Sequence, residues 1–211
     1  MTAVITGDII KSQDSQPTIW LQTLKQALST LDKKRSDNTV AKVRWEVYRG
    51  DSFQIEITDA RHCFEAALYI KACVKTVKNL DVRMAIGIGA KSFEGDSITE
   101  SNGEAFQFSG ETLETLKKEK VNLKIKTNNE QLNNELNLYF RLALIAMNSW
   151  TPNSAEIVKL SLEQPKALQK ELASQIGISQ NTVSERQKRA NLDELMELDT
   201  MFRKKIDRLL T

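Results

Sequence analysis

The spacing of apolar residues changes part-way along this chain of 211 residues, and the change limits the folds available to it. Over roughly the first 127 residues the spacing switches between the two-residue period of strands and the wider period of helices. After Glu130 it is helical throughout, and Pro152 and Pro165 mark helix boundaries. The sequence therefore predicts an α+β domain over 1–128, a connecting helix over 129–151 and an all-helical domain over 152–211.

The first domain contains four predicted strands and two predicted helices in the order β-α-β-β-α-β. The strands are expected near 3–5, 43–47, 53–57 and 82–88, and the helices near 17–35 and 59–79. This order is typical of a ferredoxin-like fold, in which right-handed crossovers place the first strand between the third and the fourth. A further helix near 104–118 and a strand near 121–127 are expected to extend this fold.

Two aspartates follow predicted strands in this arrangement. Asp8 comes after the first strand, and Asp51 lies in the turn of the hairpin formed by the second and third strands. The predicted topology brings both turns to one edge of the sheet. Mg²⁺ takes one or two protein carboxylates and shares phosphate oxygens, so this placement indicates a Mg²⁺–nucleotide site. The alternative is that both residues only stabilise turns, where Gly-Asp pairs are common.

Three segments carry a resemblance to a known family: VITGDII at 4–10, RGDSF at 49–53 and VRMAIGIG at 82–89. They resemble the palm domain of class III nucleotidyl cyclases, whose relatives include the diguanylate cyclases. The resemblance implies that Asp8 and Asp51 supply metal carboxylates and that Ile9 supplies a backbone carbonyl, all three next to the nucleotide. The whole chain more specifically resembles the SatD-like family of small bacterial proteins, which shares a segment like GEAFQFSG at 103–110 and implies no defined activity.

The chain departs from the cyclase pattern at positions that catalysis needs. The base-reading lysine of the cyclases is replaced by Val47, and the ribose-positioning Asn and phosphate-stabilising Arg are replaced by Gln107 and Glu111. At the arginine position, catalysis requires a positive charge that stabilises the phosphate, whereas the negative charge of Glu111 would repel the triphosphate. We therefore expect no catalytic residues and a palm-like domain that senses a ligand or dimerises. A Mg²⁺-dependent nucleotidyl cyclase or transferase that uses the two aspartates is the alternative.

The last third of the chain predicts a helix-turn-helix. A helix over 166–176 ends at Gly177, and Ser179 is a favourable N-cap for a second helix over 180–189. This unit resembles the helix-turn-helix of sigma-factor region 4, which implies a DNA-binding domain over 152–211. The N-terminal residues of the second helix would contact bases and its later residues phosphates. The base candidates are Gln180, Asn181 and Thr182, and the phosphate candidates are Ser184, Arg186, Lys188 and Arg189.

Charge supports a local nucleic-acid contact rather than a general one. The net charge of the chain is only +2, whereas residues 164–190 carry five basic and two acidic groups, a net charge of +3. Arg186 occupies a position that is commonly apolar in this motif, so the second helix is expected to be shortened or exposed there. The alternative is a helical hairpin that serves only packing or an adaptor role.

The remaining composition limits the setting and the chemistry. No apolar run approaches the ~20 residues of a membrane span, and the N-terminus does not resemble a signal peptide, so we expect a cytoplasmic protein without membrane contact. Cys63 and Cys73 are expected to be free thiols. His62 is the single histidine, which excludes multi-histidine metal sites, and we expect it to be exposed on the surface.

These observations together predict a bacterial DNA-binding transcriptional regulator. Its expected partners are double-stranded DNA, a nucleotide ligand and a second copy of the chain, because helix-turn-helix domains commonly bind as dimers. The amphipathic segment 192–210 is expected either to pack back on the helical domain or to pair with that second copy.

Overall fold

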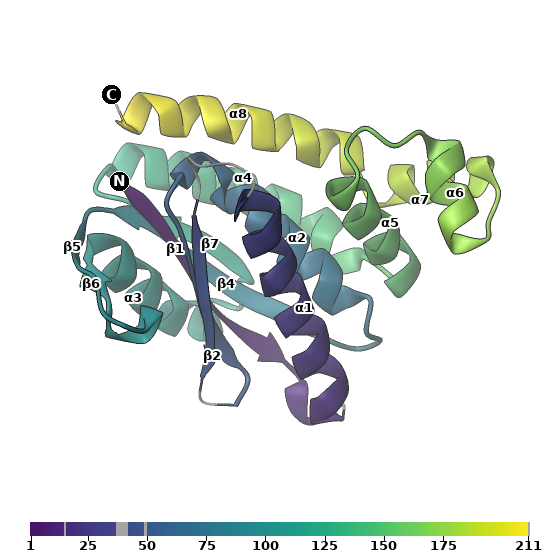
Figure 1. Ribbon diagram of the computed structural model, residues 1–211. Helices are drawn as coiled ribbons and strands as arrows, with labels where there is room; N and C mark the ends of the chain where they lie inside the picture. The colour runs from purple at the N-terminus through teal and green to yellow at the C-terminus, as the bar shows by residue number, and fades with distance from the viewer. Residues whose placement is uncertain (15, 37–41, 49, 211) are drawn as a thin grey trace.

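The structure is a computed structural model that describes residues 1–14, 16–36, 42–48 and 50–210 (Figure 1). It has a mixed α+β fold in which helices flank one sheet and a helical region follows it. The strands are β1 (Thr2–Ile10), β2 (Val43–Tyr48), β3 (Ser52–Ile57), β4 (Asp81–Gly89), β5 (Lys91–Phe93), β6 (Asn102–Gly103) and β7 (Leu123–Lys126). The α-helices are α1 (Pro17–Ser36), α2 (Cys63–Lys75), α3 (Glu104–Glu119), α4 (Glu130–Ser149), α5 (Pro152–Glu163), α6 (Gln169–Ile176), α7 (Gln180–Arg189) and α8 (Leu192–Leu210). Short 3₁₀ turns are η1 (Ser12–Asp14), η2 (Ala60–His62) and η3 (Ile98–Glu100).

The main sheet has the strand order β2-β3-β1-β4-β7 among the described residues. Neighbouring strands are antiparallel except β4 and β7, which are parallel. The predicted position of the first strand, between the third and the fourth, is confirmed. That strand is longer than predicted, because Thr6 and Asp8 continue the strand as buried polar residues with partners on neighbouring elements.

The two faces of the sheet are covered by different helices. α1 and α2 pack on one face, where Val82, Met84 and Ile86 of β4 enter the main hydrophobic core. α3 packs on the other face. A Cβ atom on Gly87 would lie 2.1 Å from the carbonyl oxygen of Ala105, so the absence of a side chain lets α3 lie directly on β4.

The main core continues from the sheet into the C-terminal helices. The rings of Phe64 in α2, Phe140 in α4 and Phe202 in α8 pack together, and the centroids of Phe64 and Phe140 are 4.9 Å apart. α8 runs along α2 and α4 at the top of Figure 1. Instead of packing back mainly on the helical domain, as expected, α8 packs on η2, α2 and α4. One core therefore crosses the predicted borders near 128 and 152. None of the described helices is long and apolar enough to cross a membrane.

Candidate functional site

The predicted helix-turn-helix consists of α6 and α7, supported by α5. A small core of its own joins these helices and contains Ile157, Leu172, Ala173 and Val183. Gly177 ends α6 in the left-handed conformation, with φ of 68°, as a glycine C-cap does. The unit lies at the end of the molecule away from α3 (Figure 1).

The start of each helix is fixed by a local hydrogen bond. Ser179 caps α7, because its Oγ accepts a hydrogen bond of 3.1 Å from the backbone N–H of Thr182. α6 begins at Gln169, three residues later than the predicted Lys166. The Glu171 side chain accepts a hydrogen bond of 2.8 Å from the N–H of Leu168 and so defines the later start.

The predicted base-contacting residues lie at the accessible end of α7. Gln180 and Asn181 are exposed, and Thr182 is half-buried with its hydroxyl 2.9 Å from that of Ser179. Val183 is fully buried and faces the small core. The first turn of α7 therefore presents two amide side chains to solvent, while the next residue anchors the helix.

The predicted phosphate-contacting residues divide into two groups. Lys188 and Arg189 are exposed, and Ser184 is half-buried. Arg186 is instead half-buried against α5: its Nη1 donates a hydrogen bond of 2.9 Å to Glu156, and its side chain is only 15% exposed. This ion pair joins α7 to α5. The helix continues to Arg189, so it is not shortened at Arg186, contrary to the expectation.

The Asp8 carboxylate has two cationic partners on the α3 side of the sheet. Arg83 lies directly opposite Asp8 on β4 and donates two hydrogen bonds to it, of 2.9 and 3.0 Å. Lys117 of α3 lies 3.4 Å from the same carboxylate. Asp8 is buried, so this bidentate pair is shielded from solvent and holds β1, β4 and α3 together.

Asp51 is close to Asp8 in the sheet but has different partners. Its backbone oxygen accepts a hydrogen bond of 3.1 Å from the N–H of the buried Ile9, and the register pairs Asp8 with Ser52. Its carboxylate accepts a hydrogen bond of 2.7 Å from Ser12, in the turn that leads to α1. The backbones therefore converge as predicted, while the two carboxylates are held by different segments: Asp8 by Arg83 of β4 and Asp51 by Ser12.

This arrangement does not present two unoccupied carboxylates to one ion. A shared Mg²⁺ would have to displace the Arg83 guanidinium from Asp8 and the Ser12 hydroxyl from Asp51. The described residues also hold no cluster of three or more metal-ligating side chains. The site at Asp8, Ile9 and Asp51 thus stays a prediction.

Two cations near Asp8 were missed at the sequence level. Arg83 lies 75 residues from Asp8, and only the antiparallel register of β1 and β4 shows that they are opposite each other. The proximity of Lys117 to Asp8 can be predicted only if the position of α3 on the sheet is known as well.

The residues at the cyclase catalytic positions have other partners in this fold. Glu111, at the cyclase arginine position, forms an ion pair of 2.8 Å with Lys126. Gln107 is exposed and lies 3.5 Å from Asn102.

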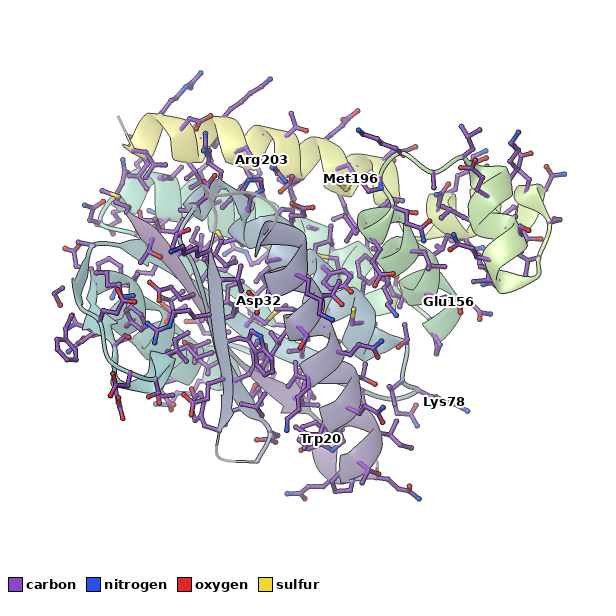
Figure 2. The ribbon with its side chains drawn as sticks, in the orientation of Figure 1. Trp20, Asp32, Lys78, Glu156, Met196 and Arg203 are labelled. Atoms are coloured by element: carbon purple, nitrogen blue, oxygen red, sulfur yellow. The ribbon has the colours of Figure 1, made fainter. Side chains whose placement is uncertain are left out.

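His62 is not the exposed surface residue that was predicted. It is half-buried, and its Nδ1 accepts a hydrogen bond of 2.8 Å from Arg203 of α8. Arg203, labelled in Figure 2, also donates to Glu65 at 2.7 Å and to Asp199 at 2.6 Å. Burial raises the pKa of the Asp199 carboxyl. This network fastens α8 to α2 and leaves His62 a structural role.

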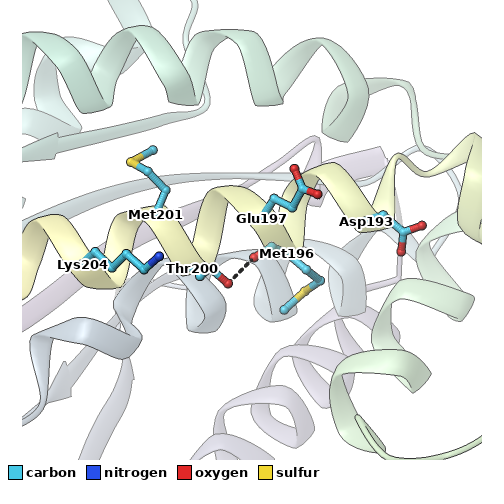
Figure 3. A pocket seen from close by; sticks show the side chains of 6 residues that line it. All are labelled: Asp193, Met196, Glu197, Thr200, Met201 and Lys204. Atoms are coloured by element: carbon cyan, nitrogen blue, oxygen red, sulfur yellow. Dashed lines mark hydrogen bonds between the residues drawn. The ribbon is translucent and has the colours of Figure 1, made fainter.

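A shallow hollow of about 540 Å³ lies along α8 (Figure 3). Its described lining residues are Asp193, Met196, Glu197, Thr200, Met201 and Lys204. The Thr200 hydroxyl donates to the Met196 carbonyl at 3.0 Å, a bond within the helix. Because one helix supplies all of these residues, polar groups do not converge there as they do in small-molecule sites.

The chain matches no protein-family model and no curated protein sequence.

Proposed function

We propose that this protein binds double-stranded DNA through α7 and acts as a transcriptional regulator. The observation that supports the proposal most directly is the exposure of Gln180 and Asn181 on the first turn of a capped helix. In a helix-turn-helix the first residues of the second helix reach the edges of the bases. Gln and Asn can each form two hydrogen bonds with adenine, so these two side chains suit sequence recognition.

The charges around α7 suit contacts with the DNA backbone. Lys188 and Arg189 are exposed on α7, and Lys170 is exposed on α6. Arg186 does not contribute in this arrangement, because its guanidinium is paired with Glu156. We therefore assign the phosphate contacts to Lys170, Lys188 and Arg189, with about one released counterion for each contact.

We further propose that the first domain is a ferredoxin-like, palm-type domain that senses a ligand or dimerises. The β2-β3-β1-β4 order with antiparallel neighbours supports this fold. The alternative, a Mg²⁺-dependent nucleotidyl cyclase or transferase, has less support because Asp8 and Asp51 already have other partners. A homodimer would supply two copies of α7, as DNA half-sites require.

The test is fluorescence anisotropy of the full-length protein with labelled genomic fragments at two salt concentrations. Lys188→Ala should weaken binding to every fragment and reduce the slope of log affinity against log salt by about 1. Asn181→Ala should cost about 1–3 kcal/mol on the preferred fragment and little on random DNA. Lys204→Ala, which removes an exposed lysine from α8, is the matched control and should bind like the unaltered protein.

Two results would contradict the proposal. One is an absence of binding at low salt, where even non-specific contacts are strong. The other is equal weakening by Lys188→Ala and Lys204→Ala, which would mean that α7 has no special part in the contact. Either result would favour the alternative that the helical unit is an adaptor that only binds another protein.

A further inference from the structure

A second cavity, of about 480 Å³, lies at the end of the sheet where β1 finishes and β4 begins. Its lining comes from the end of β1, the α2–β4 loop, the α3–β7 loop and the corner between α4 and α5. The lining residues include Lys11, Lys75, Lys78, Asn79, Asn122 and Trp150. A cavity of this volume, lined by several separate segments, is of the size that holds a small molecule.

Positive charge dominates this cavity. Lys11, Lys75 and Lys78 line it, and its only acidic lining residue in the described chain is Asp81. Asp81 is already engaged: one carboxylate oxygen lies 2.6 Å from the buried Lys71 ammonium and the other 3.6 Å from that of Lys75. Among the described residues, four ammonium groups, those of the three lining lysines and of the buried Lys71, are thus balanced by one carboxylate, that of Asp81.

Two of these lysines are not neutralised by any carboxylate that the structure describes. Lys11 and Lys78 are exposed, and neither has a carboxylate partner among the described side chains. Figure 2 shows Lys78 on the loop that follows α2. The attraction between an ammonium group and an anion is strongest when the anion enters a concave site lined by several cations, because solvent screening is reduced there.

The backbone at the rim of the cavity is strained. Among the described residues, four that are not glycine have a positive φ, and two of them, Lys11 at 62° and Asn79 at 68°, line this cavity. A lysine pays about 1–2 kcal/mol for the left-handed conformation, whereas asparagine tolerates it more readily. Such strain gathers at ligand-binding sites, and here it places two side chains on one rim.

The rest of the wall supplies hydrogen-bonding groups and an apolar surface. The side-chain amides of Asn79 and Asn122 can donate to oxygen atoms of a ligand. Trp150, which is buried, and Pro152 form an apolar side. The Trp150 indole N–H is already used in a hydrogen bond of 3.0 Å to Ala190, so its ring contributes packing only.

We propose that this cavity binds a small molecule that carries a phosphate group, through Lys11 and Lys78 with help from Lys75 and the two asparagines. Phosphate oxygens match ammonium and amide donors in both charge and geometry. The apolar wall suits the part of the ligand that carries no charge. The site is separate from Asp8 and its partners on the α3 side, and the inference does not depend on DNA binding.

The experiment uses pyrophosphate as the probe and the full-length protein at low salt. Isothermal titration calorimetry should show binding that weakens as salt rises. Amide chemical shifts in ¹H–¹⁵N spectra should change at Lys11, Asn79 and Asn122 before they change elsewhere. The double variant Lys11→Gln, Lys78→Gln should bind at least tenfold more weakly, because each loses a charge-assisted hydrogen bond. Both positions are exposed, so the variant should fold normally.

A matched control separates this site from general attraction of anions. The double variant Lys33→Gln, Lys204→Gln removes the same charge from α1 and α8, outside the cavity, and should bind pyrophosphate unchanged. The proposal is overturned if no heat of binding is seen up to about 10 mM probe. It is equally overturned if both double variants lose affinity to the same extent, or if the shift changes map to another surface.

Discussion

The buried ion pair behind the lysine-lined cavity allows a quantitative test of how charge is held in this fold. The side chain of Lys71 is fully buried, and its ammonium lies 2.6 Å from Asp81 and 2.9 Å from the side-chain oxygen of Asn148. Burial lowers the pKa of the Lys71 ammonium, and the negative charge of Asp81 opposes that shift. The Asp81 carboxylate is therefore the group that favours the protonated, charged form of the buried Lys71 side chain.

Removing that carboxylate should be costly. Asp81→Asn keeps the shape of the side chain and leaves the ammonium buried without a counter-charge. Breaking a buried pair in this way costs about 3–5 kcal/mol, and we expect the lower end because Asn148 still accepts a hydrogen bond. Lys71→Met removes the buried charge itself and leaves Asp81 with Lys75, so the free energy of unfolding should change by less than about 1 kcal/mol.

The measurement is urea unfolding followed by circular dichroism at pH 7 and at higher pH. Because the folded-state pKa of Lys71 lies below the unfolded value of about 10.5, the unfolded chain binds more protons between the two values. The free energy of unfolding should therefore rise with pH through that window in the unaltered protein, relative to Lys71→Met. A loss below about 1 kcal/mol in Asp81→Asn, or equal losses in both variants, would refute the reasoning.

Three further outcomes follow from the packing. Gly87→Ala should lower the free energy of unfolding by about 3 kcal/mol in urea titrations, because the new methyl would meet the Ala105 carbonyl at 2.1 Å; Gly110→Ala, with open space around it, is the control. Phe202→Ala should cost about 3–5 kcal/mol in the same assay, since it removes a fully buried ring from the three-phenylalanine cluster. Burial raises the pKa of the Cys73 thiol to about 12, so a thiol reagent at pH 8 should label it only after urea unfolding; rapid labelling of the native protein would contradict this burial.

Periodicity predicted most of the elements because it reports which face of each segment is buried. The hairpin, α1, α3, α4 and the central position of β1 all follow from this local pattern and from the handedness of crossovers. The length of β1 does not, because Thr6 and Asp8 are polar residues that only distant partners, Ser109 and Arg83, make compatible with burial.

The ion-pair and hydrogen-bond partners of the charged residues could not be predicted from the sequence for a related reason. The partners of Arg186, His62 and Asp8 are 30, 141 and 75 residues away. A pattern of charges along the chain does not show which pairs will meet, because that depends on how helices pack. The same residues therefore seemed available for phosphate, solvent or metal, whereas the fold uses each of them in an ion pair or hydrogen bond.

The continuity of the core from the sheet through α8 would limit the DNA sites open to the proposed regulator. Phe202 and the Arg203 network fix α8 to α2, and the Trp150 hydrogen bond fixes the end of α7 to the corner before α5. If α7 binds DNA as proposed, it is joined to the first domain by this shared core. It then lacks the flexible linker that lets some regulators tolerate variable spacing between half-sites. In a two-fold dimer, the distance between the two copies of α7 would then have one fixed value. The two DNA half-sites would have to match that distance. Insertion of about five base pairs, half a turn of DNA, should then leave only one half-site engaged.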